Sequence, residues 1–230
     1  MKEKIINIFK CIFLFILFFT ISAIPILIFR IDINKFSDLD TVIYSLACSL
    51  LFLVIIMLCY KQTLIKDFKP YFKNFGKNFE ESFKYYLVGV GIMIFSNLII
   101  TLLFQGDLST NESTVRSYIN ASPLLMAIDI SFYAPLSEEL LFRKSIRDVV
   151  KNKWLYIFIS GFVFGGMHVV GTEGLLGLLY LIPYCSLGFT FAYIYAKTDN
   201  IYSSIILHFM HNTISLILLL VGASLQWKKY

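Results

Sequence analysis

Seven long apolar segments dominate this chain of 230 residues and limit the folds open to it. Hydrocarbon offers no hydrogen bonds to a bare backbone, so an uncharged stretch of about 18 or more residues satisfies its peptide groups internally, as a helix. Only 15% of the residues are charged, against about 25% in soluble domains. The sequence therefore predicts an all-α, polytopic transmembrane helical bundle. We expect about seven spans, near residues 5–29, 41–60, 85–104, 123–146, 154–170, 175–196 and 201–221.

The basic residues predict how these spans are oriented, because cytoplasmic loops carry an excess of Lys and Arg. With the N-terminus placed in the cytoplasm, 15 of the 20 basic residues fall in cytoplasmic segments. We therefore expect a cytoplasmic N-terminus. Lys228 and Lys229 are the exception, and they leave the orientation of the C-terminus open. The composition, rich in Lys, Ile, Phe and Asn, is typical of a low-GC bacterium, so we expect a multi-pass protein of the bacterial plasma membrane.

One polar stretch, residues 61–84, carries lysines between aromatic residues that recur at steps of mostly three and four. The pattern suits a helix in the membrane interface, with its rings among the headgroups and its lysines toward anionic lipid. Pro70 and Gly76 weaken a continuous helix, and an ordinary cytoplasmic loop explains the charges equally well. The aromatic residues of this stretch are Phe68, Tyr71, Phe72, Phe75 and Phe79. The net charge of +5 of the whole chain follows from its membrane topology and predicts no nucleic-acid partner.

Two adjacent carboxylates, Glu138 and Glu139, lie inside an otherwise apolar helical segment. A charge at this depth is costly unless it is paired or has a task, so it is by default a functional hypothesis. Arg143 follows Glu139 at i+4, on the same face, and predicts a buried ion pair. Glu138 points about 100° away around the helix and needs another partner. A carboxylate in such a position suits a general acid or base.

The three histidines of the chain also lie in apolar segments. His168 follows three glycines that allow close helix packing, and, taken alone, a histidine near the end of a span more often has a hydrogen-bonded packing role or an interfacial one. His208 and Asn212 share a face at i and i+4, with His211 close to it. His208 and Asn212 can form hydrogen bonds between helices, or they can donate hydrogen bonds to an oxyanion. Counted at about 1.5 Å per residue from the assumed cytoplasmic helix ends, Glu138 lies about 13 Å deep, His208 about 12 Å, Asn212 about 18 Å and His168 about 21 Å. Tilt can account for the greater depth of His168, so we expect a shared pocket part-way into the bilayer from the cytoplasmic side.

These motifs occur together and in order, as Glu-Glu-x-x-x-Arg, Phe-x-x-x-His and His-x-x-x-Asn in separate apolar segments. The combination resembles the CPBP family, which includes the CAAX prenyl endopeptidases (Rce1-like) and the bacteriocin-processing Abi proteins. The blocks SEELLFR, SGFVFGGMH and LGFTFAYIYAKTDNIYSSIILHFMHN are similar to those of the family. The resemblance covers roughly Ser131 to Leu216. We expect one membrane domain, with N-terminal spans in residues 1–120 and the CPBP-like catalytic helical region in residues 121–222.

The resemblance implies an intramembrane endopeptidase whose polar cavity opens to the cytoplasm. It implies that Glu138 is the general base and that His168 helps it to activate water. His208 and Asn212 would stabilise the oxyanion, and Glu139 with Arg143 would order the site. A set formed by Glu138, His168 and His208 could hold Zn²⁺. A metal-free site in which Glu and His activate the water serves equally, so both alternatives stay open.

The expected partners are the lipid bilayer and a peptide or protein substrate in or at the membrane. For a bacterial protein, the substrate would be a small membrane-associated or secreted precursor, as in bacteriocin maturation or self-immunity. A non-catalytic immunity or scaffold protein of the same fold is the alternative. A proton-coupled transporter fits less well, because the chain has no repeated half and no paired broken helices. Every motif position is occupied by its polar residue. Because polar residues within a membrane are costly and a scaffold has no need of all of them, this favours the enzyme.

Overall fold

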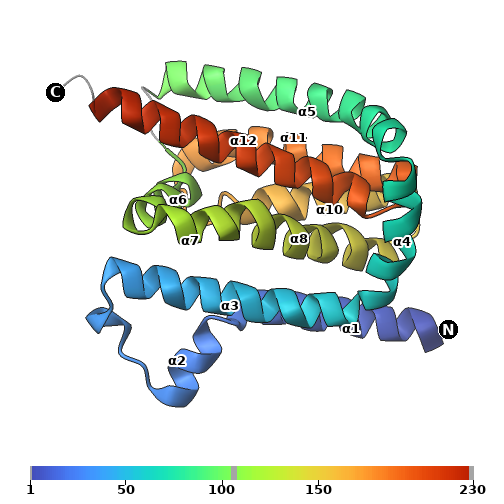
Figure 1. Cartoon of the computed structure of the whole chain (residues 1–230), viewed down its shortest axis with the longest axis horizontal. Helices are drawn as coiled ribbons and strands as arrows, with labels where there is room; N and C mark the ends of the chain where they lie inside the picture. Colours follow the sequence, from blue (N-terminus) through green and yellow to red (C-terminus); the bar gives the residue numbers. More distant parts are fainter. Residues whose placement is uncertain (1, 105–107, 228–230) are drawn as a thin grey trace.

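The computed structural model describes residues 2–104 and 108–227, and every regular element in these ranges is a helix (Figure 1). The all-α membrane bundle predicted from the sequence is confirmed. Lys228 and Lys229 lie outside the described residues. The elements are α1 Lys2–Thr20, α2 Ala23–Phe29, η1 Ile33–Lys35, α3 Asp38–Cys59, α4 Lys61–Lys73, α5 Phe75–Leu103, α6 Thr110–Ala121, α7 Pro123–Ile128, η2 Asp129–Tyr133, α8 Ala134–Glu138, η3 Glu139–Ser145, α9 Ile146–Val149, α10 Lys153–Met167, α11 Gly174–Thr198 and α12 Tyr202–Trp227.

Fewer helices than expected are long and apolar enough to cross a membrane. Within the described residues, α3, α5, α11 and α12 qualify, and the bent pair α1 and α2 would make a fifth span. This test asks for a single helix of spanning length, so the expected number of about seven spans stays a prediction. The segment near 123–146 is helical throughout but alternates between α and π geometry, so no single α-helix in it reaches spanning length. The segment near 154–170 forms the 15-residue helix α10. The cytoplasmic N-terminus stays a prediction.

The first apolar segment, expected as one span, is broken into two helices that meet at 64°. Pro25 lies in α2, and its ring would clash with the carbonyl of Ile21, four residues earlier. It also has no N–H for that carbonyl. The helix therefore ends at Thr20, and α2 runs away from the bundle in Figure 1.

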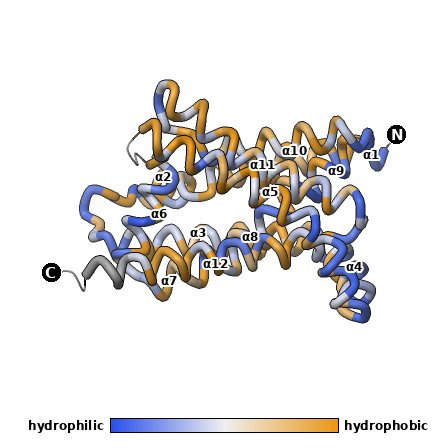
Figure 2. The backbone as a smooth tube through the Cα atoms, turned by 90° about the horizontal axis from the view of Figure 1, so that it is seen from above, coloured by the Kyte–Doolittle hydropathy of each residue, from blue (hydrophilic) through white to orange (hydrophobic). Residues whose placement is uncertain are grey.

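The long helices run side by side, with the N-terminus and the end of α12 at opposite ends of the bundle (Figure 1). Hydrophobic residues prevail along the helices, while α4 and the connections at the ends are more hydrophilic (Figure 2). This distribution fits a bundle surrounded by lipid, because exposed apolar side chains such as Leu102 and Phe95 need no cover there.

Glycines bring α10 and α11 into close contact. A Cβ added at Gly165 would lie 2.8 Å from the backbone nitrogen of Cys185, and one at Gly188 would lie 2.6 Å from the carbonyl oxygen of Gly161. Small residues are the usual means by which membrane helices approach each other. The packing role expected for Gly161 and Gly165 is thus observed, and it sets His168 beside α11. Gly166 has nothing within 4 Å of an added Cβ.

Candidate functional site

Residues 123–149 form one continuous helical run that contains two π turns, η2 and η3. Single π turns within a helix are rare and often occur at functional sites. Glu138 ends α8, and Glu139 begins η3. The run therefore presents both carboxylates at a junction between α and π geometry.

His208 of α12 joins the two carboxylates. Its Nδ1 lies 2.9 Å from Oε1 of Glu139, and its Nε2 lies 3.8 Å from Oε2 of Glu138. The Glu139 side chain is fully buried, whereas the Glu138 side chain is 17% exposed. Glu138 thus has the partner that the sequence required, and it is the more accessible carboxylate of the pair.

Arg143 closes the buried side of this cluster. Its Nε lies 3.1 Å from Oε2 of Glu139, both side chains are fully buried, and the contact is an ion pair without hydrogen-bond angles. Nη1 of Arg143 donates to the hydroxyl of Ser160 at 3.4 Å, and that hydroxyl donates to the carbonyl of Phe142 at 2.7 Å. The guanidinium also lies 4.5 Å from the centre of the Phe164 ring, in a cation–π contact. The Glu139–Arg143 pair expected from the i+4 spacing is present.

His168 lies at the C-terminal end of α10 and contacts a backbone carbonyl and aromatic rings. Its Nδ1 is 2.9 Å from the carbonyl oxygen of Phe164, and its ring stacks on Tyr184 of α11 with centres 4.9 Å apart. The Phe164 ring contacts both His168, at 4.6 Å, and His208, at 5.8 Å. Within the described residues, no hydrogen bond or ion pair joins His168 to Glu138. The structure therefore brings His168 to the cluster through the Phe164 ring.

Asn212 lies one turn beyond His208 on α12 and reaches the other π turn. Its Nδ2 donates to the carbonyl of Ile130 at 2.9 Å. That carbonyl lacks its usual helical partner, since the N–H of Ala134 donates to Asp129 instead. Pro135, the next residue, has no N–H to offer. One N–H of Asn212 thus satisfies a carbonyl freed by the π turn, and its other N–H is not used by this bond.

His211, which is outside the motif, faces a different helix. Its Nδ1 lies 3.1 Å from the hydroxyl of Tyr86 in α5. Tyr86 stacks on Phe191, and Phe191 stacks on His208 with ring centres 4.9 Å apart. His211 is therefore connected to the cluster through two aromatic rings.

The donor set does not match a metal site as arranged. Among the described residues, no group of three or more His, Cys, Asp and Glu side chains is gathered so that it could hold a metal ion. Of the candidates, Glu138 and His208 lie near each other, but Nδ1 of His208 is taken by Glu139 and Nδ1 of His168 by a carbonyl. We therefore derive no chemical step through a metal.

Several residues around the site carried no recognisable signal in the sequence. Ser160 supports Arg143, and Tyr184 covers His168, but a lone Ser or Tyr in an apolar helix is ordinary. Ser109 is fully buried and lies 3.0 Å from the Tyr184 hydroxyl. Asp129, at the start of η2, has a buried Oδ1 without a hydrogen-bond partner in the described residues. Of these, only Asp129 could have been found, as a further intramembrane carboxylate.

The fold and the site together define a polytopic helical membrane protein with an ionic cluster buried between its helices. Residues 120–214 match the family model described as "Type II CAAX prenyl endopeptidase Rce1-like". The resemblance deduced from the motifs is confirmed: the chain is similar to the CPBP family of membrane proteases.

Two curated bacterial proteins are similar over most of their length. "Putative membrane peptidase YdiL" of Bacillus subtilis is 29% identical over 194 residues, which are 77% of this chain and 70% of that protein. "UPF0177 protein YxdF" of Lactococcus lactis is 28% identical over 144 residues, 60% of this chain and 78% of that protein. No solved structure matches the chain. The similarities support a multi-pass bacterial membrane protein.

Proposed function

We propose that this protein is an intramembrane endopeptidase in which Glu138 activates the attacking water. The observation that carries the proposal is the unequal environment of the two carboxylates around His208. Glu139 is fully buried and neutralised by Arg143, whereas Glu138 is partly exposed and lies 3.8 Å from His208 Nε2. A carboxylate that is accessible and has no short ion pair keeps its lone pairs for a proton from water.

The neighbouring groups have complementary roles in this proposal. The Glu139 carboxylate accepts from His208 Nδ1, which fixes the ring and directs Nε2 toward Glu138. With both nitrogens protonated, Nε2–H and the second N–H of Asn212 would donate to the oxyanion. His168, fixed at Nδ1, would hold the water through Nε2. Arg143 pairs with the Glu139 carboxylate and acts as a positioning residue.

The reaction balances with these groups alone. Glu138 takes a proton from water while the oxygen bonds to the scissile carbonyl carbon, and the carbonyl electrons move to oxygen. When the tetrahedral intermediate collapses, the C–N bond breaks and the leaving nitrogen takes the proton from Glu138. One peptide bond and one water become a carboxylic acid and an amine. We infer small membrane-associated or secreted peptide precursors as substrates, in bacteriocin maturation or self-immunity.

The test is N-terminal proteomics of membranes from cells that express wild-type protein, Glu138→Gln, His168→Ala or the control Glu173→Gln. Glu173 is an exposed carboxylate that contributes no interaction to the cluster. Cleavage products should be present with wild type and the control, and reduced about 10²- to 10⁴-fold in the two site variants. Wild-type levels of cleavage in both site variants would contradict the proposal. A chelator control tests separately whether activity depends on a metal.

A non-catalytic immunity or scaffold protein is the second candidate. Its support is that His168 makes no direct bond to Glu138 within the described residues. In that case the site variants would keep the immunity phenotype of the wild type while no cleavage product appears with any of the proteins.

A further inference from the structure

Helix α4 has three distinct faces. Leu64, Asp67 and Tyr71 are buried and lie on the side toward the bundle. At about 100° per residue, a second face carries Ile65, Phe68 and Phe72, and a third carries lysines. The side chains of the second face remain 60%, 53% and 38% exposed. The lysine face, opposite the buried one, is formed by the exposed residues Lys66, Lys69 and Lys73.

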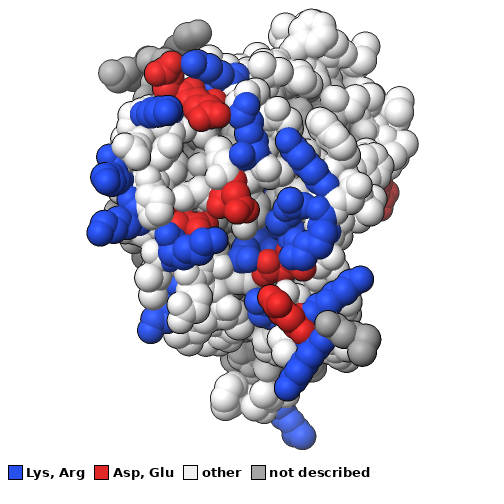
Figure 3. Space-filling model, turned by 90° about the vertical axis from the view of Figure 1, so that its right-hand side faces the viewer, with Lys and Arg blue, Asp and Glu red and all other residues white. Residues whose placement is uncertain are grey.

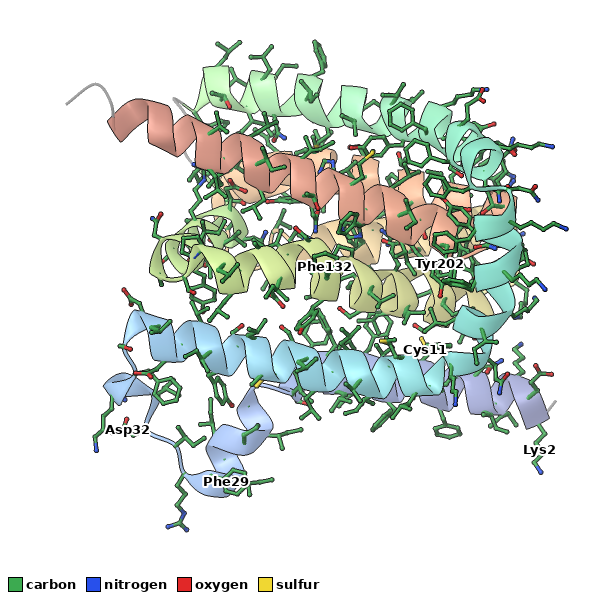
Figure 4. All side chains as sticks on the ribbon, viewed as in Figure 1. Lys2, Cys11, Phe29, Asp32, Phe132 and Tyr202 are labelled. Atoms are coloured by element: carbon green, nitrogen blue, oxygen red, sulfur yellow. The ribbon has the colours of Figure 1, made fainter. Side chains whose placement is uncertain are left out.

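The helix lies across the end of the bundle (Figure 1). It is fastened there to the start of α12. The N–H of Ile201 donates to the Asp67 carboxylate at 3.0 Å, and the Asn200 side chain donates to the Asp67 carbonyl at 2.8 Å. Tyr202, labelled in Figure 4 beside α4, contacts the rings of Phe68 and Phe72. These bonds keep the two exposed faces in fixed directions.

The lysines of this segment are largely uncompensated. Within the described residues, the ion pairs of residues 61–84 are Lys84 with Glu80 at 2.8 Å and Glu81 with Lys197 at 3.8 Å. Asp67 is buried and turned toward α12. The space-filling view of this end shows Lys and Arg side chains gathered over the surface, with fewer acidic groups between them (Figure 3). The surface therefore favours an anionic partner.

We propose that α4 is a binding surface for anionic phospholipid headgroups. The exposed apolar face next to the lysine face favours a lipid partner over an acidic protein, because it can contact acyl chains. A helix with this division lies in the plane of the interface, apolar side toward the acyl chains and lysines among the headgroup phosphates. Phe68, Phe72 and Phe75 form a contacting series of rings that suits the headgroup boundary. The inference is independent of the proteolytic activity.

The test uses the purified full-length protein in detergent, titrated with phosphatidylglycerol or phosphatidylcholine and followed by native mass spectrometry. We compare wild type with Lys66→Gln/Lys69→Gln/Lys73→Gln. Glutamine keeps helix propensity and removes only the charge. The matched control is Lys2→Gln/Lys4→Gln/Lys35→Gln, three exposed lysines outside α4. Apparent affinity for phosphatidylglycerol should fall about tenfold or more in the α4 variant and stay near wild type in the control.

Ile65→Gln/Phe72→Gln removes the apolar face and leaves the lysines in place. It should weaken retention of both lipids, while the lysine variant affects phosphatidylglycerol alone. An equal affinity of the wild type for the two lipids would overturn the proposal, and so would an equal loss in the control. Binding of soluble polyglutamate at least as tightly as phosphatidylglycerol would assign the surface to an acidic protein. Monodisperse size-exclusion profiles show that each variant is folded.

Discussion

The two motif histidines of the site are held in opposite ways. His208 is almost fully buried and lies between two carboxylates, one of which is paired with Arg143. His168 is half-buried, bonded to a backbone carbonyl and stacked on Tyr184. We call the surroundings of His208 the ionic end of the site and those of His168 the neutral end. The stability of the ionic end requires all of its charges, because a buried charge without its partner is costly. The neutral end depends on packing and single hydrogen bonds, each of which contributes less.

The largest effect is expected at the ionic end. Arg143→Ala leaves the Glu139 charge without its cation and should lower the free energy of unfolding by about 3–5 kcal/mol. Unfolding by SDS titration in mixed micelles measures the loss. The double variant Glu139→Leu/Arg143→Met removes both charges and should recover most of it. The control is Arg147→Ala, a half-buried Arg on the next turn that bonds backbone carbonyls. If Arg143→Ala costs no more than this control, the ionic end is not the stabilising one.

An intermediate effect is expected where α12 meets the π turn. Asn212→Ala leaves the Ile130 carbonyl without its donor and should cost about 1–3 kcal/mol in the same assay. Pro135→Ala restores an N–H to the turn and lets the helix supply its own bond. In that background Asn212→Ala should cost clearly less, which a double-mutant cycle measures. Additive losses would mean that the bond of Asn212 is unrelated to the π turn.

The smallest effect is expected at the neutral end. Tyr184→Phe removes the bond to Ser109, keeps the stacking on His168 and should cost about 0.5–1.5 kcal/mol. Tyr184→Leu removes the stacking as well. The ring nitrogen NMR shifts of His168 should change progressively in the two variants, while those of His208 serve as the internal control. Unchanged His168 shifts in Tyr184→Leu would show that Tyr184 does not position this histidine.

Local spacing was sufficient to predict the contacts within one helix. Glu139 and Arg143 are one turn apart, so any helix brings them together, and the ion pair is observed. The glycines of α10 likewise predicted close packing, which Gly161 and Gly165 make with α11. The contacts between helices were beyond this reasoning. Glu138 was expected to face a different set of partners from Glu139, yet His208 lies against both.

Breaks within helices were also missed. Pro25 splits the first apolar segment, and Pro135 lies two residues after the π turn η2, although both prolines were visible in the sequence. Apolar runs indicate that a helix is stable in lipid but not whether it is straight. In the lysine- and aromatic-rich stretch, residues 61–84, the sequence pattern likewise did not decide the local structure. An interfacial helix and a loop fitted it equally, and α4 is a helix that ends before Asn74, with Pro70 inside it and Gly76 in α5.

The sequence by itself determined that the chain is a helical membrane bundle, and its motifs indicated which family it resembles, because hydropathy and residue spacing are local properties. The roles of the site residues stay predictions. Only the tertiary structure decided which groups meet. It set His208 between Glu138 and Glu139, gave Asn212 the Ile130 carbonyl and placed Tyr184 over His168. Each of these contacts joins helices that are far apart in the chain, and their relative rotation depends on how whole helix surfaces pack.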